Sequence, residues 1–170
     1  MRNRDDMMTT SEIPGRYELP DLQSCREWII PSSFCQIQPV VSEALAELGE
    51  RPDLDAVELA LHEALTNAIA HGNQESISKS VRVTLARCGR GAVVLAVKDC
   101  GSGFNASLVA DPLGDRLMSD RGRGIFLMRQ LVAWVDFVYN QGTEVRLWLT
   151  LPDEISAAAL RGVARSASKP

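Results

Sequence analysis

The sequence predicts an α+β fold, a two-layer sandwich in which helices cover one face of a mixed or antiparallel sheet. Two segments in the first half repeat apolar residues at helical spacing, whereas later segments alternate apolar and polar residues with period two, as strands do. The predicted order is strand, two helices, two strands, a glycine-rich loop, one helix and two strands. Because helices and strands do not alternate one by one in this order, it argues against a parallel sheet with crossover helices.

Proline and glycine set the predicted element boundaries. Pro31 ends the first strand, and Gly49 and Gly72 follow the last periodic residues of the two long helices. The expected elements are, in chain order, a short strand within 25–33, helices over 34–48 and 53–72, a hairpin over 81–98, a long loop over 99–124, a helix over 125–134 and a hairpin over 134–151. We expect residues 1–21 to be a flexible lead-in, 22–152 to form one domain and 153–170 to be a tail.

Composition narrows the class of function. The 170 residues are 45% hydrophobic and 24% charged, which is ordinary globular usage, and the net charge of -4 argues against direct nucleic-acid binding by general phosphate neutralisation. The four cysteines form no C-x-x-C pair, so a zinc site is not expected. The start of the chain has no apolar signal region and no stretch is long enough to span a bilayer, so we expect a cytoplasmic protein that does not bind membranes.

The helix predicted over 53–72 carries a polar stripe beside its apolar face. Glu63, Asn67 and His71 are four residues apart and therefore lie on one side of the helix. A carboxylate can take up a proton, and an amide oxygen is a ligand that hard cations accept. The alternative interpretation, a capped and solvated helix edge, suits the same residues.

Two glycine-containing segments are further candidates. Asp99, Gly101 and Gly103 follow a predicted strand, where the glycines allow a sharp turn and the carboxylate presents an acceptor; strand ends also carry such residues simply as turns. A second segment precedes a helix and combines glycine amides with arginine charge, which suits a polyphosphate, although a flexible hinge with solvated arginines has the same pattern. It consists of Arg121, Gly122, Arg123 and Gly124. Neither the Walker pattern nor the Rossmann pattern of glycines is present.

In their order along the chain, these segments resemble the motifs of the Bergerat-fold ATPases. EALTNAIAHG resembles the N box, DCGSGF the first glycine box, GRGIFLM the second, and GTEVRLWL the final adenine-side strand. The resemblance covers about residues 30–151. This superfamily includes DNA gyrase, heat-shock chaperones, histidine kinases and the anti-sigma factor serine kinases. The form EAxxNAxxHG and the small size look most like the anti-sigma factor serine/threonine kinases.

The resemblance implies ATP and Mg²⁺ as cofactors and gives roles to single residues. Glu63 would be the general base, Asn67 the magnesium ligand and Asp99 the acceptor for the adenine amine, while residues 104–121 would form a lid. For His71, an interaction with the helix dipole is an equal alternative. The other cofactor-binding residues implied are His71, Gly101, Gly103, Arg121, Gly122, Arg123, Gly124 and Thr143.

The resemblance also implies a function and partners. It predicts transfer of phosphate from ATP to a serine or threonine of an anti-sigma factor antagonist of the STAS type, together with sequestration of a sigma factor and formation of a homodimer. The alternative is an ATP-binding regulatory interaction module without catalysis, which would not need Glu63. An ATP hydrolase of the gyrase type would need a transducer domain after the last predicted strand, and we do not expect it.

Overall fold

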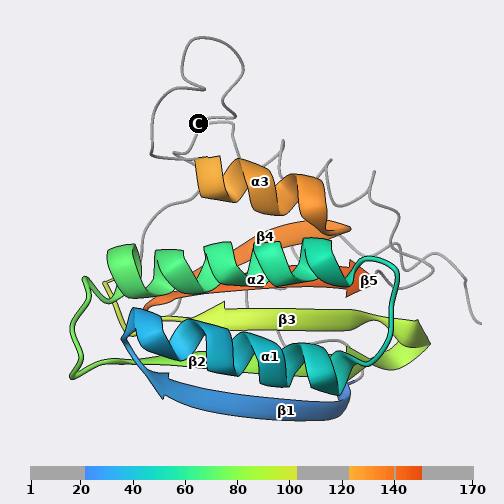
Figure 1. The fold of residues 1–170 in the computed structure, drawn as a ribbon, viewed down its shortest axis with the longest axis horizontal. Coiled ribbons are helices and arrows are strands. Elements are labelled where there is room, and N and C mark those ends of the chain that lie inside the picture. Colours follow the sequence, from blue (N-terminus) through green and yellow to red (C-terminus); the bar gives the residue numbers. More distant parts are fainter. Residues whose placement is uncertain (1–21, 103–122, 140, 151–170) are drawn as a thin grey trace, which may run out of the picture.

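The computed structural model describes residues 22–102, 123–139 and 141–150. Within these residues, five strands form one sheet in the order β1-β2-β3-β5-β4, and every neighbouring pair is antiparallel (Figure 1). The elements are β1 (Leu22–Pro31), α1 (Ile37–Leu48), α2 (Leu54–Asn67), β2 (Ser80–Cys88), β3 (Val93–Lys98), α3 (Arg123–Leu131), β4 (Trp134–Tyr139) and β5 (Thr143–Thr150). The predicted α+β sandwich is confirmed, with an antiparallel sheet.

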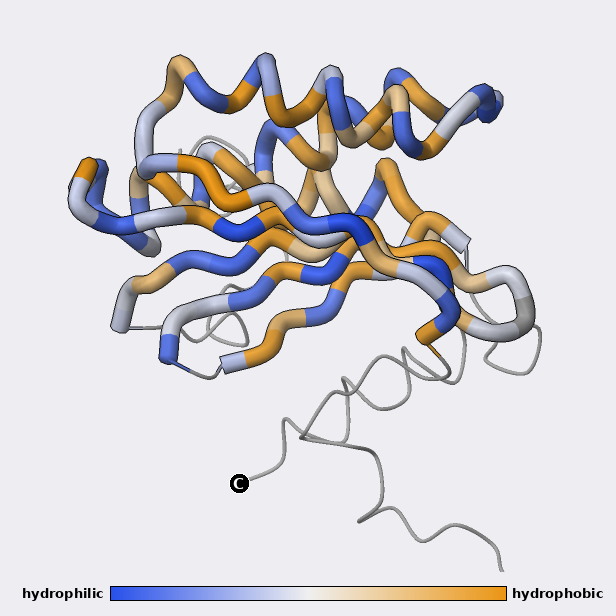
Figure 2. The backbone as a smooth tube through the Cα atoms, turned by 90° about the horizontal axis from the view of Figure 1, so that it is seen from below, coloured by the Kyte–Doolittle hydropathy of each residue, from blue (hydrophilic) through white to orange (hydrophobic). Residues whose placement is uncertain are grey.

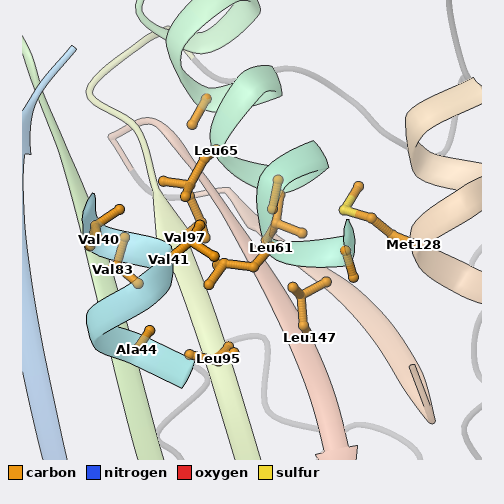
Figure 3. Packing of buried hydrophobic residues seen from close by; sticks show 14 of the residues in the cluster. Val40, Val41, Ala44, Leu61, Leu65, Val83, Leu95, Val97, Met128 and Leu147 are labelled. Atoms are coloured by element: carbon orange, nitrogen blue, oxygen red, sulfur yellow. The ribbon is translucent and has the colours of Figure 1, made fainter. Parts of the chain in front are cut away.

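The helices form one layer and the strands the other (Figure 2). The core lies between the layers, where Val41 of α1, Leu61 of α2 and Met128 of α3 are fully buried and pack with sheet residues such as Leu147 (Figure 3). Each such side chain contributes roughly 1.5 to 3 kcal/mol by leaving water. The apolar face predicted for the second helix is the buried one, except that Leu54 is only half-buried. This burial fixes which side of α2 remains for polar residues.

Three predicted boundaries were wrong. The first strand is longer than expected, because β1 starts at Leu22 and pairs with β2 along its whole length. The first helix was expected from residue 34, but Phe34–Gln36 form a 3₁₀ turn before α1 begins. The helix expected over 125–134 is α3, which ends at Leu131. Trp134 begins β4, as the hairpin predicted over 134–151 requires; it pairs with Trp148 of β5 and packs in a second small apolar cluster.

The second long helix changes its winding before it ends. It is α-helical to Asn67, and Ala68–Gly72 continue as a π-helical turn, in which the N–H of Asn73 donates to the carbonyl of Ala68 at 2.8 Å. The single helix predicted over 53–72 is therefore wrong in its last five residues. Apolar periodicity could not show this, since one wider turn leaves Ala68 and Ile69 buried as an α-helix would. No helix among the described residues is long and apolar enough to cross a membrane.

Candidate functional site

The candidate site residues gather where several elements end together. Asp99 directly follows β3, and its N–H donates to the carbonyl of Thr143, the first residue of β5, at 2.9 Å. The π-helical turn after α2 ends beside them, because Gly72 approaches the carboxylate of Asp99 closely. Segments that lie far apart in the sequence thus meet at one end of the sheet.

The carboxylate of Asp99 is buried and held by backbone groups. The side chain is 4% exposed, and its Oδ1 accepts hydrogen bonds from the N–H of Gly101 at 2.8 Å and of Thr143 at 3.0 Å. Its Oδ2 has no hydrogen-bond partner among the described residues and faces Gly72. One oxygen therefore fixes the side chain, and the other is left as an acceptor for a ligand that brings a donor.

Two glycines let the backbone come this close. A Cβ on Gly72 would overlap the Asp99 carboxylate, and a Cβ on Gly101 would overlap the carbonyl oxygen of Gly72. The helix end and the turn after β3 therefore touch backbone to backbone, with the acid between them. Gly72 was predicted only as the end of a helix, and the structure places it in the site as well.

Asn73 is a site residue that the sequence did not reveal. Its side chain is 0% exposed, accepts from the N–H of Cys100 at 2.9 Å and donates to the carbonyl of Ser80 at 2.9 Å. An asparagine after a helix-ending glycine is a common turn residue, and that is all its position in the sequence indicates. Its partner Cys100 is 27 positions away, so only the folded chain shows the contact.

A second group forms between α2 and α3. A Cβ on Gly124, in the first turn of α3, would lie 2.6 Å from Oε2 of Glu63 and 3.3 Å from Nδ2 of Asn67. Both of these side chains are half-buried on α2, and neither has a hydrogen-bond partner among the described residues. The structure thus brings together Glu63, Asn67 and Gly124 and leaves a carboxylate and an amide available to a ligand.

The remaining predicted residues are placed less closely. His71 is exposed in the π-helical turn, and no hydrogen bond or ion pair joins its side chain to the other site residues among those described. Thr143 is 4% exposed and reaches the site through its backbone N–H to Asp99. Arg123 begins α3. Gly103, Arg121 and Gly122, and the lid predicted over 104–121, lie outside the described residues.

The arrangement can bind a ligand that differs at its two ends. Asp99 offers a fixed acceptor for an N–H group, and Glu63 and Asn67 offer oxygen atoms of the kind that Mg²⁺ accepts. Within the described part of the chain, no group of three or more His, Cys, Asp or Glu side chains could hold a metal ion without help. A cation here would therefore need further oxygen ligands from the bound molecule or from water.

Comparison with solved structures finds bacterial light-regulated kinases. The blue-light activated histidine kinase of Erythrobacter litoralis EL346 is 18% identical with a TM-score of 0.45, and the match covers 74% of this chain and 43% of that one. This chain thus spans less than half of that protein. The isolated histidine kinase domain of the same protein is 17% identical with a TM-score of 0.43, covering 83% of this chain and 67% of the domain. No curated protein matches the chain significantly.

Comparison with protein families gives one match over most of the fold. The profile described as the histidine kinase-like ATPase domain matches residues 31–149, which is well over half of the chain and includes α2, the turn after β3, α3 and β5. The matched range contains every described residue of the candidate site. The chain belongs to the histidine kinase-like ATPase domain family.

Proposed function

We propose that this domain is an ATP-dependent serine/threonine protein kinase that phosphorylates an anti-sigma factor antagonist and also sequesters a sigma factor. Membership of the ATPase domain family supports ATP binding and a regulatory, kinase-like function. The observation that carries the finer proposal is the position of Glu63, whose carboxylate faces Gly124 beside Asn67 and has no hydrogen-bond partner among the described residues. The carboxylate is therefore available to a ligand or to a reacting hydroxyl group.

The two ends of the site suit the two ends of ATP. Asp99 would accept a hydrogen bond from the adenine amine through Oδ2, and Asn67 would hold Mg²⁺ through its amide oxygen. This fits the residues present, because Mg²⁺ takes one or two protein ligands and completes its octahedron with phosphate oxygens and water. When bound, the ion would offset charge on the phosphates. Gly124, which has no side chain, lets the first turn of α3 lie close to Glu63 and Asn67.

Glu63 would act as the general base. A serine or threonine hydroxyl of the partner attacks the γ-phosphorus of ATP, the bond from that phosphorus to the bridging oxygen breaks, and ADP leaves. Glu63 accepts the proton of the attacking hydroxyl, so the products are a phosphoserine or phosphothreonine, ADP and a protonated carboxyl that later loses its proton to water. The interaction-module alternative has no use for a carboxylate at this position.

The proposed partners are a STAS-type antagonist, a sigma factor and a second copy of this chain. Support for the homodimer comes from β1, which is an edge strand with nearly all of its side chains exposed. An edge strand presents unpaired backbone groups that another strand can join. Sedimentation equilibrium of the wild-type chain tests this part: a dimer supports it, and a monomer at high micromolar concentration contradicts it.

The kinase proposal is tested with Glu63→Gln. The amide keeps the size of the side chain but is not a base, so ATP affinity should be retained while phosphate transfer falls by roughly 10² to 10⁴. The measurement is transfer from radiolabelled ATP to candidate antagonist proteins, followed by acid treatment, which phosphoserine survives and phosphohistidine does not. Sigma factor binding is measured in parallel by pull-down.

Matched variants make the result specific. Glu58→Gln removes a carboxylate from the same helix and should leave transfer unchanged, whereas Asn67→Ala should weaken both Mg²⁺-dependent ATP binding and transfer. Transfer by Glu63→Gln at the wild-type rate would show that the base assignment is wrong. If the wild-type chain binds ATP and a sigma factor but labels no antagonist, the interaction module is the correct function.

A further inference from the structure

We propose that Asn73 is a positioning residue that sets adenine selectivity by holding the turn Asp99–Gly101 against the end of α2. The inference rests on the proposed ATP site, since it concerns how the adenine acceptor of that site is kept in place. Asn73 would not touch the nucleotide. It would act through the backbone of Cys100, which lies between the acid Asp99 and the amide of Gly101 that fixes it.

The side chain of Asn73 uses both halves of its amide. The Oδ1 atom accepts from the N–H of Cys100, and Nδ2 donates to the carbonyl of Ser80, each at 2.9 Å. The side chain is completely buried, so loss of either bond leaves a backbone group without its partner in a region that excludes water. The first residue of β2 and the turn after β3 are thus tied to one residue at the end of α2.

The π-helical turn brings Asn73 to this position. The wider turn adds one residue before the helix ends, and the N–H of Asn73 still finds a partner in the carbonyl of Ala68. Gln74 and Glu75 then adopt positive φ angles of 56° and 55°, which turn the chain sharply toward β2. Two successive non-glycine residues in this conformation cost energy, and the well-bonded Asn73 beside them offsets this cost.

The contact is with the turn that determines the position of Asp99. Gly101 donates to Oδ1 of Asp99, and this bond requires the peptide groups on either side of Cys100 to keep their orientation. Without Asn73 the N–H of Cys100 is free to rotate away, and the N–H of Gly101 moves with it. The acceptor Oδ2 would then lose its fixed direction, so binding of adenine and discrimination against guanine should weaken together.

The experiment measures ATP and GTP affinity of the full chain by calorimetry. Asn73→Ala should lower ATP affinity by about tenfold or more and reduce the preference for ATP over GTP by a similar factor. At saturating ATP the rate of phosphate transfer should change little, because Glu63, Asn67 and Gly124 lie between the helices and are not bonded to this turn. Val41→Ala, a core variant on α1, is the control for general loss of stability and should keep the ATP preference.

A second variant should show a pH-dependent ATP affinity, which a merely structural role of Asn73 would not produce. In Asn73→Asp the introduced carboxylate can accept from Cys100 but repels the carbonyl of Ser80, whereas the protonated carboxyl can donate to that carbonyl as the amide does. Relative to wild type at the same pH, its ATP affinity should be about tenfold lower at pH 8 and should recover to within about threefold at pH 5.5. This variant decides the question if Asn73→Ala does not fold.

The outcomes separate the two proposals. If wild type binds no ATP, the proposed function fails and this inference fails with it. If wild type binds ATP with a preference over GTP, and folded Asn73 variants keep the same affinity and preference at both pH values, the positioning role alone is wrong. A lower melting temperature without a change in nucleotide preference would equally overturn it.

Discussion

At the Asp99 end of the site, backbone amides hold a buried carboxylate in one orientation, whereas Glu63 and Asn67 have no hydrogen-bond partner among the described residues. The first end is rigid because four segments meet there through backbone groups. The second end is shaped mainly by the packing of α2 against α3, where a Cβ on Gly124 would meet the side chains of Glu63 and Asn67. In the proposed function, the first end would bind the adenine base, which has a fixed shape, and the second would keep its polar groups for the charges that change during phosphate transfer.

The largest effect should come from adding a side chain at the Asp99 end of the site, where the backbone of Gly101 lies against the backbone of Gly72. In Gly101→Ala the new Cβ would collide with the carbonyl of Gly72, and backbone on both sides cannot move aside as a flexible side chain could. We expect ATP affinity to fall by about 100-fold or more, which corresponds to about 3 kcal/mol. Isothermal calorimetry with ATP and Mg²⁺ measures it.

The control is Gly91→Ala, in the turn between β2 and β3. Gly91 has a positive φ of 75° but no atom within 4 Å of the position of a Cβ, so the substitution strains the backbone without a collision. It should lower the melting temperature and leave ATP affinity unchanged. Equal loss of affinity in both variants would mean that general strain, and not the contact with Gly72, explains the result.

Gly124→Ala tests the other end of the site. Alanine suits a helix better than glycine by about 1 kcal/mol, so α3 itself should tolerate the change. The new Cβ would push against Oε2 of Glu63 at 2.6 Å, and a misplaced base costs up to about 100-fold in rate. We therefore expect transfer at saturating ATP to fall by about 10 to 100-fold.

Affinity for adenosine, which lacks phosphates, should stay within about twofold of wild type in Gly124→Ala, because the Asp99 end is untouched. Gln130→Ala on the exposed side of α3 is the matched control and should change neither quantity. If Gly124→Ala weakened adenosine binding as much as transfer, the two ends would not be independent.

The sequence named the candidate residues between α2 and α3 more completely than those at the Asp99 end of the site. Glu63 and Asn67 were found because both lie on one helix, where a spacing of four residues places side chains together. The sequence did not reveal the contact of Asn73 with Cys100 or the contact of Gly72 with Asp99. Local periodicity contains no information about residue pairs so far apart in the sequence.

The fold shows the same limit. The order of strands along the chain followed from period-two patterns, and antiparallel pairing within the two hairpins followed from their short turns. The sequence left the sheet as a whole mixed or antiparallel, and the pairing of β1 with β2 and of β3 with β5 came only from the structure. The end of α3 did not follow from the sequence, because the apolar pattern of the helix continues to Trp134. In the structure α3 ends at Leu131, and Trp134 begins β4, where the hairpin was predicted to begin. The π-helical turn was missed for a related reason, since its apolar residues are buried in either kind of helix.

Asp136 is a half-buried aspartate that lacks the backbone hydrogen bonds which hold the side chain of Asp99. It lies on β4, and its Oδ1 has no hydrogen-bond partner in the part of the chain that the structure describes. The indole N–H of Trp148 reaches its Oδ2 only at 3.4 Å. Burial raises the pKa of Asp136 to about 6, although the charge of Arg146 opposes this. The folded chain therefore holds the proton of the Asp136 carboxyl more tightly than the unfolded chain does. The contribution of this proton to the free energy of unfolding is greatest below about pH 4 and is lost as the pH rises to about 6.

Asp136→Asn should therefore leave the free energy of unfolding almost unchanged at pH 4 and raise it by about 1 to 3 kcal/mol at pH 8. Urea unfolding of wild type and variant at both pH values measures the difference. Destabilisation at pH 8 would contradict the prediction and would show that attraction between Asp136 and Arg146 outweighs the cost of burying the charge.

The smallest effect, and the most specific, is expected for Asp99→Asn. The amide oxygen can still accept from Gly101 and Thr143, so the side chain should keep its place while its NH₂ group replaces the free acceptor Oδ2. A donor at this point opposes the amine of adenine and suits the carbonyl oxygen of guanine. Wild type should prefer ATP over GTP by about tenfold, and the variant should lose this preference or reverse it. Competition between the two nucleotides for the same chain measures the ratio directly, with thermal unfolding to verify that the variant is folded. An unchanged preference in a folded variant would mean that Asp99 does not read the base, and that the rigid end of the site holds some other part of its ligand.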